Sequence, residues 1–314
     1  MTAEEQYLST LQTIMDSGMD YGDRTGVGRK GCWCLPVRVD LTKEFPLLTT
    51  KRVTLRWVAE ELFWILSGST YEPHLREKGV DIWKEWATPE ETARFGREEG
   101  ELGPVYGHCW RNFGAGLIKD VYGSEDQSLI HYGRRYSDKT KRWINTNYLD
   151  NGVDQIKWIV DDIKNNPFGT RKILSGWDPR EQDKVALPPC HTISHFKVWP
   201  DGTLSSFLMQ RSCDQFLGSP YNLASYSLLT TLIAHVCDLK PREHVHMFND
   251  VHIYHNHYDA VNEQLGRLPY NPPTITIDDR LRGGGFDALM DVKWEDIELH
   301  NYEHHPKIEA PIAV

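Results

Sequence analysis

Hydrophobic positions recur along this chain with two different periods, and together they predict both helices and strands. Apolar residues three or four positions apart fill residues 4–18, which is the spacing of an amphipathic helix. Residues 55–66 form a more strongly apolar helical run that contains two glutamates. Further helices are expected over 154–165 and 223–238.

Alternating segments indicate strands. Residues 32–41 alternate in this way, and 171–177, 192–199 and 203–210 are expected to follow as three successive strands. The turn Pro200-Asp201-Gly202 joins the last two of them.

The chain shows no repeat, no low-complexity tract and no linker, so one domain is expected over residues 1–314. The predicted fold class is α+β, with a mixed sheet flanked by helices. Residues 22–28 and 103–107 are turn-rich loops. Residues 116–150 are polar and irregular, and we interpret them as a surface insertion. The basic run at 139–142 makes an RNA contact there a minor alternative.

The formal net charge of −10 argues against a nucleic-acid backbone as the main partner. A phosphate site would therefore have to be assembled locally from a few arginines. The composition, with 39% hydrophobic and 25% charged residues, is typical of a globular protein in water. The N-terminal segment lacks the basic and apolar regions of a secretory signal, and no stretch approaches the ~18 apolar residues of a membrane span. A cytoplasmic location without a membrane partner is expected.

Six cysteines are scattered through the chain, which favours free thiols in a reducing compartment over a disulfide framework. Cys32 and Cys34 are two positions apart, so a strand would place both on one face. No further ligands follow at a suitable spacing, and no metal site is predicted.

The most informative segment is the run Leu-Pro-Pro-Cys-His at 187–191. It contains Cys190, and Arg211, Ser212 and Asp214 follow further along the chain. A nucleophilic cysteine reacts as its thiolate, which nearby positive charge stabilises, and Arg211 could also bind an anionic substrate. A buried structural cysteine is the alternative for this segment taken alone.

Several other side chains suit a nucleotide ligand. Guanidinium groups, whose planar fork matches phosphate oxygens, are available from Arg24, Arg171 and Arg211. The amide of Asn222 carries both a donor and an acceptor, which suits the edge of a pyrimidine ring. His252 and Tyr254, two apart on an expected strand, point the same way and could hold a sugar hydroxyl.

Taken together, these residues resemble the thymidylate synthases that use methylenetetrahydrofolate and no flavin. The resemblance covers nearly the whole chain, apart from residues 113–152. The motifs that carry it are Asp23-Arg24-Thr25-Gly26, Phe45-Pro46-Leu47-Leu48-Thr49-Thr50-Lys51, Gly103-Pro104-Val105-Tyr106-Gly107, Pro188-Pro189-Cys190-His191, Gln210-Arg211-Ser212 and Ala310-Pro311-Ile312-Ala313-Val314. The resemblance also implies a homodimer formed through one face of the sheet.

The activity implied by this resemblance is reductive methylation of dUMP to dTMP, with methylenetetrahydrofolate as donor of carbon and hydride and without a metal or flavin. Cys190 would add to ring carbon 6 of dUMP, and carbon 5 would then attack the folate methylene. Glu61 would organise water and proton transfers, Tyr106 would help to remove the carbon 5 proton, and His191 would support the water network. Asp214 is also expected at the catalytic centre.

The resemblance further implies a set of binding residues. The phosphate would be held by Arg24, Arg211 and Ser212, with Arg171 donated across the dimer interface. Asn222 would read the uracil edge, and His252 and Tyr254 would hold the deoxyribose 3′-hydroxyl. The folate-facing positions would be Ile82, Trp83, Trp86, Leu187, Asp214, Leu217, Gly218 and Tyr221. The C-terminal tail with Ala313 would close over the ligands and exclude water.

The chain departs from the family pattern at several positions. Thr170 stands where an arginine is usual, so the phosphate contribution of the second subunit is weakened or rebuilt. Lys172 should point to the opposite face from Arg171, which makes it a poor replacement. Further departures are Asp178, His195, Met209, Tyr221 and Asn249.

Two alternatives follow from these departures. A hydroxymethylase on the same scaffold would let water reach the methylene and would give hydroxymethyl-dUMP and tetrahydrofolate. The other alternative is a non-catalytic nucleotide- or RNA-binding regulator. The intact cysteine, glutamate, tyrosine and asparagine disfavour it, as does the acidic net charge.

Overall fold

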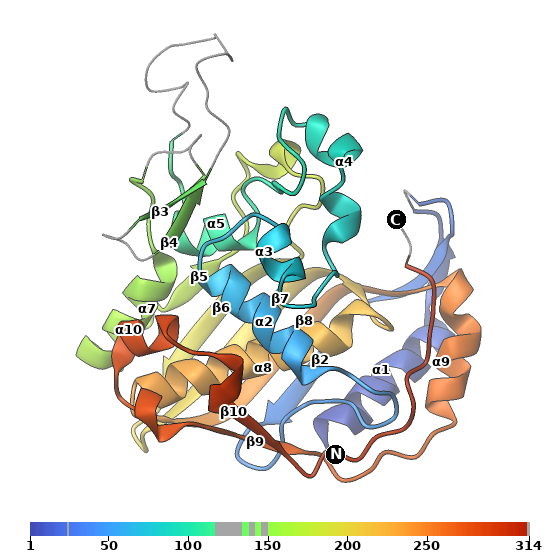
Figure 1. Ribbon diagram of the computed structural model, residues 1–314. Coiled ribbons are helices and arrows are strands. Elements are labelled where there is room, and N and C mark those ends of the chain that lie inside the picture. Colours follow the sequence, from blue (N-terminus) through green and yellow to red (C-terminus); the bar gives the residue numbers. More distant parts are fainter. Residues whose placement is uncertain (24, 117–133, 138–141, 146–149, 313–314) are drawn as a thin grey trace.

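The centre of the molecule is a mixed sheet of six strands, seen behind the helices in Figure 1. The structure is a computed structural model and describes residues 1–23, 25–116, 134–137, 142–145 and 150–312. The strands of the sheet are β1 (Met19–Tyr21), β2 (Arg29–Asp40), β5 (Ile173–Ser175), β6 (His191–Val198), β7 (Thr203–Asp214) and β8 (Lys240–Tyr254). Their order is β1-β2-β8-β7-β6-β5, and all neighbours are antiparallel apart from the parallel pair β7 and β8.

Helices cover one face of this sheet (Figure 1). The longer ones are α1 (Ala3–Ser17), α2 (Leu55–Leu66), α7 (Gln155–Asn165), α8 (Gly218–Val236) and α9 (Tyr258–Leu265). The shorter ones are α3 (Pro73–Arg76), α4 (Pro89–Ala93), α5 (Tyr106–Arg111) and α10 (Gly285–Met290). Single 3₁₀ turns are η1 (Lys84–Trp86), η3 (Gln182–Lys184), η4 (His255–His257), η5 (Asp279–Leu281) and η6 (Trp294–Asp296). Two small antiparallel ladders pair β3 (Arg134–Ser137) with β4 (Arg142–Asn145), and β9 (Thr274–Ile277) with β10 (Ile297–His300).

The central helix α8 connects the parallel strands β7 and β8 and is buried along most of its length. Its sequence is apolar on nearly all sides, which is the pattern of a helix enclosed by other elements. Helix α1 lies against β2 and β8, and α2 packs against α8. Local signals fix the helix starts: Thr2 and Glu5 form a capping box at α1, and Asp154 accepts the Lys157 N–H at α7. The described buried side chains from Ala3 to Ile308 join in a continuous core, as a single domain requires.

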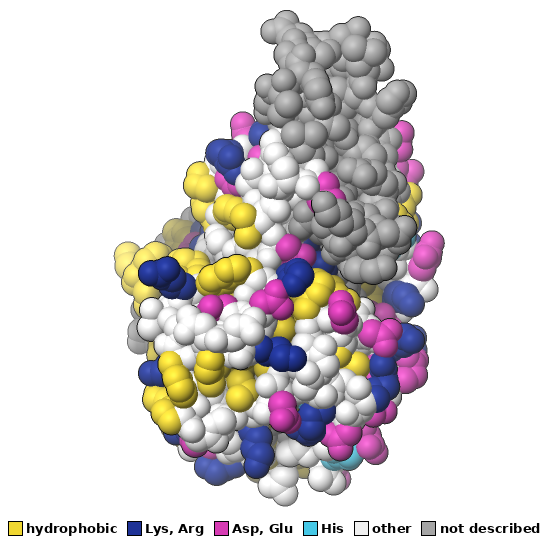
Figure 2. Space-filling model, turned by 90° about the vertical axis from the view of Figure 1, so that its left-hand side faces the viewer, with side chains coloured by type: hydrophobic (Ala, Val, Ile, Leu, Met, Phe, Trp, Pro, Cys, Tyr) yellow, Lys and Arg dark blue, Asp and Glu magenta, His cyan; other side chains and the backbone are white. Residues whose placement is uncertain are grey.

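The opposite face of the sheet exposes hydrophobic side chains. In β6 the odd-numbered residues from 193 onward point to this open face, and Ile193 is 37% exposed. Ile173 of β5 and Trp33 of β2 are also exposed. Figure 2 shows hydrophobic side chains gathered along one flank of the molecule, beside a surface of mixed charge. Exposed apolar surface of this kind is typical of an interface.

Strand pairing is interrupted along a line that crosses the sheet. The register skips Cys34 of β2, Asn249 of β8 and Arg211 of β7, and β6 carries a bulge between His191 and Ile193. Cys34 has a positive φ of 57°. After such an irregular residue, the side chains of a strand point to the opposite face from the one that strict alternation predicts. Cys32 therefore faces α1, with its sulfur 4.0 Å from the Thr13 carbonyl oxygen, whereas Cys34 is exposed. The prediction that the two cysteines share one face is wrong for this reason.

The expected strand over 171–177 is shorter in the structure, where only Ile173–Ser175 is paired. The Lys172 side chain is buried, and its ammonium group donates to the carbonyl oxygens of Asn166 at 2.7 Å and Gly169 at 2.8 Å. These bonds close a loop before β5, so Arg171 lies outside the sheet.

Other expected elements keep their positions but change their ends. Helix α8 begins at Gly218 and not at 223, which brings the whole segment around Asn222 into the helix. The expected loop over 103–107 runs into α5, since Tyr106 is the first residue of that helix.

The expected irregular insertion over 116–150 contains the hairpin of β3 and β4 within its described part. Trp143 of β4 donates its backbone N–H to the Ser67 carbonyl oxygen at 3.0 Å. The Trp143 ring lies 4.8 Å from that of His74. The hairpin is thereby attached to the end of α2 and to α3. Among the helices that the structure describes, none is both long enough and apolar enough to cross a membrane.

Candidate active site

The loop that carries Cys190 is held by hydrogen bonds from Arg211. The guanidinium group donates from Nε to the Pro189 carbonyl oxygen at 2.9 Å and from Nη2 to that of Pro188 at 2.8 Å. The backbone N–H of Arg211 donates to the Cys190 carbonyl oxygen at 2.8 Å. A positive charge therefore lies on the loop of a half-buried cysteine, and such an environment favours the thiolate.

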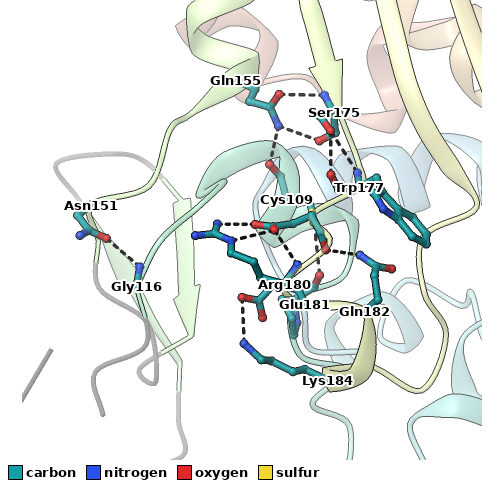
Figure 3. Close-up of polar contacts among 12 residues, drawn as sticks. Cys109, Gly116, Asn151, Gln155, Ser175, Trp177, Arg180, Glu181, Gln182 and Lys184 are labelled. Carbon is teal, nitrogen blue, oxygen red and sulfur yellow. Dashed lines mark hydrogen bonds and ion pairs between the residues drawn. The ribbon is translucent and has the colours of Figure 1, made fainter. Parts of the chain in front are cut away.

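Trp177 lies beside this arginine, with its ring centroid 5.3 Å from the guanidinium carbon of Arg211. The segment before Trp177 is fixed by Gln155 of α7 (Figure 3). The amide nitrogen of Gln155 donates to the carbonyl oxygens of Cys109 and Ser175, each at 2.8 Å. Its oxygen accepts the Ser175 N–H at 2.9 Å. Helix α7 thus ties α5 to β5 next to the arginine.

Asp178, one of the departures from the family pattern, is neutralised within its own turn. Its carboxylate accepts from Nε of Arg180 at 3.0 Å and from Nη2 at 2.6 Å. These bonds hold the pKa of the Asp178 carboxyl below its usual value. Gln182 donates to the Asp178 carbonyl oxygen. Figure 3 shows Arg180 and Gln182, the two residues that bind Asp178 in this turn. The additional charge is thereby paired locally.

Tyr106 contacts the cysteine loop through its hydroxyl group. The hydroxyl oxygen accepts the backbone N–H of Cys190 at 2.7 Å and that of His191 at 3.2 Å. Burial raises the pKa of Tyr106 well above its ordinary value, so the phenol keeps its proton. With two N–H groups on the oxygen, the hydroxyl hydrogen is directed toward a further acceptor.

His191 lies between the rings of Tyr106 and Tyr226, whose centroids are each 5.0 Å from that of the imidazole. Burial lowers the pKa of His191 to about 4; a hydrogen bond with Asn222 opposes this shift, and the charge of Arg211 adds to it. The imidazole is therefore neutral at pH 7, and it can exchange hydrogen bonds with water without carrying charge.

Glu61 of α2 accepts a hydrogen bond from the indole N–H of Trp83 at 2.7 Å. Burial raises the pKa of the Glu61 carboxyl to about 7, and the bond from Trp83 opposes the rise. A carboxyl group with such a pKa can both accept and release a proton at neutral pH. The Trp83 ring lies 6.0 Å from that of Tyr106, so Glu61 and Tyr106 belong to one site.

Asn222 of α8 is oriented by a strand residue. Its side-chain oxygen accepts from the amide of Gln210 at 3.0 Å, and the same amide nitrogen donates to the Ser212 carbonyl oxygen at 3.0 Å. Gln210 was missed as a site residue by sequence reasoning, although it belongs to the Gln210-Arg211-Ser212 motif. The end of β7 therefore carries an amide, a guanidinium group and a carboxylate, from Gln210, Arg211 and Asp214.

Asp214 shapes the turn that leads into α8. Its Oδ1 accepts the backbone N–H groups of Phe216 and Leu217, each at 3.0 Å. A Cβ atom at Gly218 would lie 3.7 Å from Asn222 Oδ1 and 3.9 Å from Asp214 Cβ. The side chains of Asp214 and Asn222 therefore flank Gly218 on the same side.

His252 and Tyr254 lie side by side at the end of β8, with ring centroids 5.2 Å apart. The prediction that they point the same way is confirmed. Arg29 of β2 also belongs to this cluster: its Nη1 lies 3.2 Å from His252 Nδ1, and its Nη2 lies 3.2 Å from an Asp250 oxygen. Arg29 was missed because only strand pairing brings it next to β8.

Most of the positions expected to face folate lie at the border of the core. Half-buried hydrophobic side chains in this set are Ile82, Trp86, Leu187, Leu217 and Tyr221. Trp83 is buried, and its ring lies 6.0 Å from that of Trp86. Tyr221 stands where the family usually has phenylalanine, and its additional hydroxyl group forms a hydrogen bond with the backbone of Thr54. An apolar border with few polar groups is the usual lining of a small-molecule site.

Arg171 is exposed between α7 and β5, and no described residue of this chain forms an ion pair with its guanidinium group. Thr170 is exposed as well. The Lys172 side chain is buried and lies 3.0 Å from Asp162, so its charge is paired within this chain. Arg24 and Ala313 lie outside the described residues. Within the described ranges, no group of three or more His, Cys, Asp or Glu side chains could hold a metal ion.

Comparison with known proteins agrees with this geometry. The family model for thymidylate synthase matches residues 5–314. The thymidylate synthase of Herpesvirus ateles is 44% identical over 99% of this chain and 98% of its own length. The bifunctional dihydrofolate reductase-thymidylate synthases of Paramecium tetraurelia and Zea mays are 43% and 42% identical over 99% of this chain, which spans 61% and 54% of their lengths. The chain therefore belongs to the thymidylate synthase family of one-carbon transferases, which methylate dUMP to dTMP with methylenetetrahydrofolate as co-substrate.

Proposed function

We propose that this chain methylates dUMP through a covalent adduct between the Cys190 sulfur and carbon 6 of the pyrimidine ring. The main support for the proposal is that two residues bind the cysteine loop. Arg211 donates to its carbonyl oxygens, and the Tyr106 hydroxyl oxygen accepts from its backbone N–H groups. A fixed loop keeps the sulfur in one position, and the guanidinium charge favours its thiolate.

The adduct makes carbon 5 nucleophilic, and carbon 5 attacks the methylene group of the folate. The carbon 5 proton then leaves with help from Tyr106, whose hydroxyl works through water, while Glu61 takes and returns protons near its pKa of about 7. The folate leaves its methylene on carbon 5 and then transfers a hydride to that methylene, so that the methyl group forms and the folate becomes dihydrofolate. The bond between Cys190 and carbon 6 breaks and releases dTMP. Neutral His191 supports the water network, and Asp214 holds the start of α8.

Substrate binding follows from the same constellation. The phosphate is assigned to Arg24, Arg211 and Ser212, with Arg171 supplied by a second subunit. Asn222 reads the uracil edge through its amide. His252 and Tyr254 hold the 3′-hydroxyl of the sugar, a role their adjacent rings support. Folate covers the half-buried border of the core, and the tail with Ala313 closes over both ligands.

The positions of the departures favour methylation over hydroxymethylation. His195 and Met209 lie on the open face of the sheet, opposite to the side where His191 packs on Tyr106 and Tyr226. The Asn249 side chain accepts from the Cys34 thiol at 3.6 Å, on the line of interrupted pairing. His195 and Met209 are therefore on the opposite side of the sheet from His191, which supports methylation.

The decisive experiment is the mass of the product formed from dUMP and methylenetetrahydrofolate, with the oxidation state of the folate read in the same reaction. We expect a product heavier by one methyl group, together with dihydrofolate. A hydroxymethyl product with tetrahydrofolate would show a hydroxymethylase instead. A Cys190→Ser protein should form neither; continued turnover by that variant would remove Cys190 as the nucleophile. A biological role that survives complete loss of turnover would support a binding regulator.

A homodimer through the open face of the sheet is the second part of the proposal. Exposed Trp33, Ile173 and Ile193 supply hydrophobic surface there, and the exposed guanidinium group of Arg171 is suited to reach a neighbouring phosphate site. Sedimentation should give a dimer at assay concentration, and a fully active monomer would contradict it. The six free cysteines fit a reducing, cytoplasmic compartment.

A further inference from the structure

A row of buried polar side chains runs from Asn222 into the space between the sheet and α8. Its first link is Gln210, whose amide nitrogen donates to the Asn222 oxygen and to the Ser212 carbonyl oxygen, each at 3.0 Å. The Gln210 oxygen lies 2.8 Å from Nε2 of His246. Gln210 and His246 come from neighbouring parallel strands, and both are almost completely buried.

The row continues along β8 and returns to β7. Nδ1 of His246 lies 3.4 Å from Nε2 of His244, and Nδ1 of His244 lies 2.8 Å from the Ser206 hydroxyl. The Ser206 hydroxyl meets that of Thr230 on α8 at 2.5 Å. His244, Ser206 and Thr230 are buried as well, so water does not compete for these bonds.

Counting hydrogens gives the row one direction. Both N–H groups of the Gln210 amide are used as donors, so its oxygen must accept from Nε2 of His246. Burial lowers the pKa of both histidines far below the ordinary value, so each is neutral and carries one N–H. His246 is then an acceptor at Nδ1, which requires His244 to donate from Nε2 and Ser206 to donate to Nδ1 of His244. From Ser206 to Gln210 every member then donates toward Asn222. The Thr230 hydroxyl also lies 2.7 Å from the Tyr226 carbonyl oxygen, and this direction requires its hydrogen to point to Ser206 instead.

We propose that His244 and His246 are positioning residues that set base specificity by fixing the Gln210 amide and, through it, the amide of Asn222. The inference rests on the proposed role of Asn222 as the reader of uracil. With its oxygen held by Gln210, the Asn222 amide has one orientation, in which the oxygen is an acceptor and the nitrogen a donor for the base.

The consequence for specificity follows from the two pyrimidines. Uracil offers a donor at ring nitrogen 3 and an acceptor at oxygen 4, whereas cytosine offers the reverse pattern. If His246 adopted its other tautomer, Gln210 could turn its amide and Asn222 would turn with it. The turned amide of Asn222 would present its donor and acceptor in the order that suits cytosine.

Packing alone would not require imidazole rings at these positions. His246 stacks on Phe248, with centroids 4.1 Å apart, and His244 lies parallel to the Tyr226 ring at 6.2 Å. A phenylalanine at either position would keep such ring contacts but would break the row. The conservative replacement is glutamine, which carries one donor group and one acceptor group as a neutral histidine does.

The test compares wild-type enzyme with His246→Phe, His246→Gln and His244→Phe. For each protein, kcat and KM are measured with dUMP, and the affinity for dCMP is measured as a competitive inhibitor. We expect His246→Phe to lower kcat/KM for dUMP about tenfold or more and to narrow the preference for dUMP over dCMP by a similar factor. His244→Phe should act in the same direction but less strongly, and His246→Gln should restore most of the preference. The KM for methylenetetrahydrofolate should stay within about twofold.

An unchanged preference in His246→Phe would overturn the inference and leave the histidines as packing residues. Inactivity of the wild-type enzyme on dUMP would instead remove the proposed function. If the phenylalanine variants do not fold, nitrogen NMR of the intact wild-type enzyme gives the same decision. Both histidines should be neutral, with hydrogen on Nε2, from pH 6 to 8. A charged ring, or hydrogen on Nδ1 of His246, would contradict the proposal.

Discussion

The hydroxyl oxygen of Tyr106 accepts the backbone N–H of Cys190 at 2.7 Å. The neighbouring N–H of His191 reaches the same oxygen at 3.2 Å. Arg211 binds the carbonyl oxygens on the other side of this loop. The loop is therefore fixed through both its donors and its acceptors, by residues from α5 and β7 that are far apart in the sequence.

Replacement of Tyr106 by phenylalanine should lower kcat because two amide groups lose their acceptor and the loop loses one of its holds. A buried amide without a partner costs about 1–3 kcal/mol, which corresponds to about tenfold to a hundredfold in rate if the reacting geometry bears the cost. Steady-state kinetics with dUMP checks this value, and thermal unfolding shows whether the fold is kept.

The matched control for that prediction is Tyr226→Phe. The Tyr226 ring also lies 5.0 Å from His191, but its hydroxyl group bonds to Ser194 and not to the cysteine loop. We expect a clearly smaller loss of kcat in this variant. Equal losses in both variants would mean that Tyr106 acts only as part of the aromatic packing.

The pKa of Glu61 should rise when the Trp83 N–H is removed. Burial raises this pKa to about 7, and the bond from Trp83 at 2.7 Å opposes the rise because it favours the ionised carboxylate. In Trp83→Phe the carboxylate loses this hydrogen bond, and the protonated carboxyl becomes more favourable. The part of the pH profile of kcat/KM that reports the titration of Glu61 should therefore move to higher pH by about one unit. Trp86→Phe removes a neighbouring indole N–H and should leave that part of the profile in place. A Trp83→Phe profile in which that part stays in place or moves to lower pH would contradict this account.

Acid should destabilise the protein through its buried histidines. Burial lowers the pKa of His244 from 6.5 to about 3. Because the folded pKa lies below the unfolded one, the stability present above pH 6.5 is lost as the pH falls toward 3, where the unfolded chain binds the proton first. At pH 5 the loss from His244 alone is about 2 kcal/mol.

His244→Phe removes this contribution, so its free energy of unfolding should decline less steeply than that of the wild type between pH 6.5 and 5. Denaturant titrations at several pH values measure the difference. His195→Phe, on the open face of the sheet, controls for the substitution itself. Parallel pH dependences for wild type and His244→Phe would show that this ring is protonated in the folded state.

Local patterns predicted the elements whose signals lie within one segment. The helices α1, α2 and α7 appear where the spacing of apolar residues placed them. The strand expected at 171–177 exists but is shorter, at Ile173–Ser175. Its start is delayed because the bonds of Lys172 to Asn166 and Gly169 close a loop that alternation does not report.

The candidate site was predictable only where a motif keeps its members close in sequence or where the family resemblance named them. Gln210 and Arg29 show the limit. Gln210 meets His246 because the crossover through α8 makes β7 and β8 parallel neighbours. Arg29 meets His252 because β2 pairs with the end of β8. Neither contact has a signal in spacing or composition, since strand order decides both.

Glu4 should be a main anchor of the segment before α2, and its replacement by glutamine should unfold the protein more easily. Its carboxylate accepts both N–H groups and both hydroxyl groups of Thr49 and Thr50, at 2.6–3.0 Å. Glutamine would place an N–H₂ group against these donors, so we expect a loss of about 3 kcal/mol in the free energy of unfolding. The neighbouring Glu5→Gln removes a carboxylate from an exposed position and should cost less than about 1 kcal/mol. Denaturant unfolding of both variants at pH 7 measures the difference; equal effects would mean that the buried carboxylate contributes no more than a surface cap.

The Glu4→Gln variant should also bind folate more weakly. Lys51, at the end of the segment that Glu4 anchors, donates to the Phe216 carbonyl oxygen, and Phe216 belongs to the turn that Asp214 holds. If the segment loosens, this turn loses a contact, and we expect the KM for folate to rise.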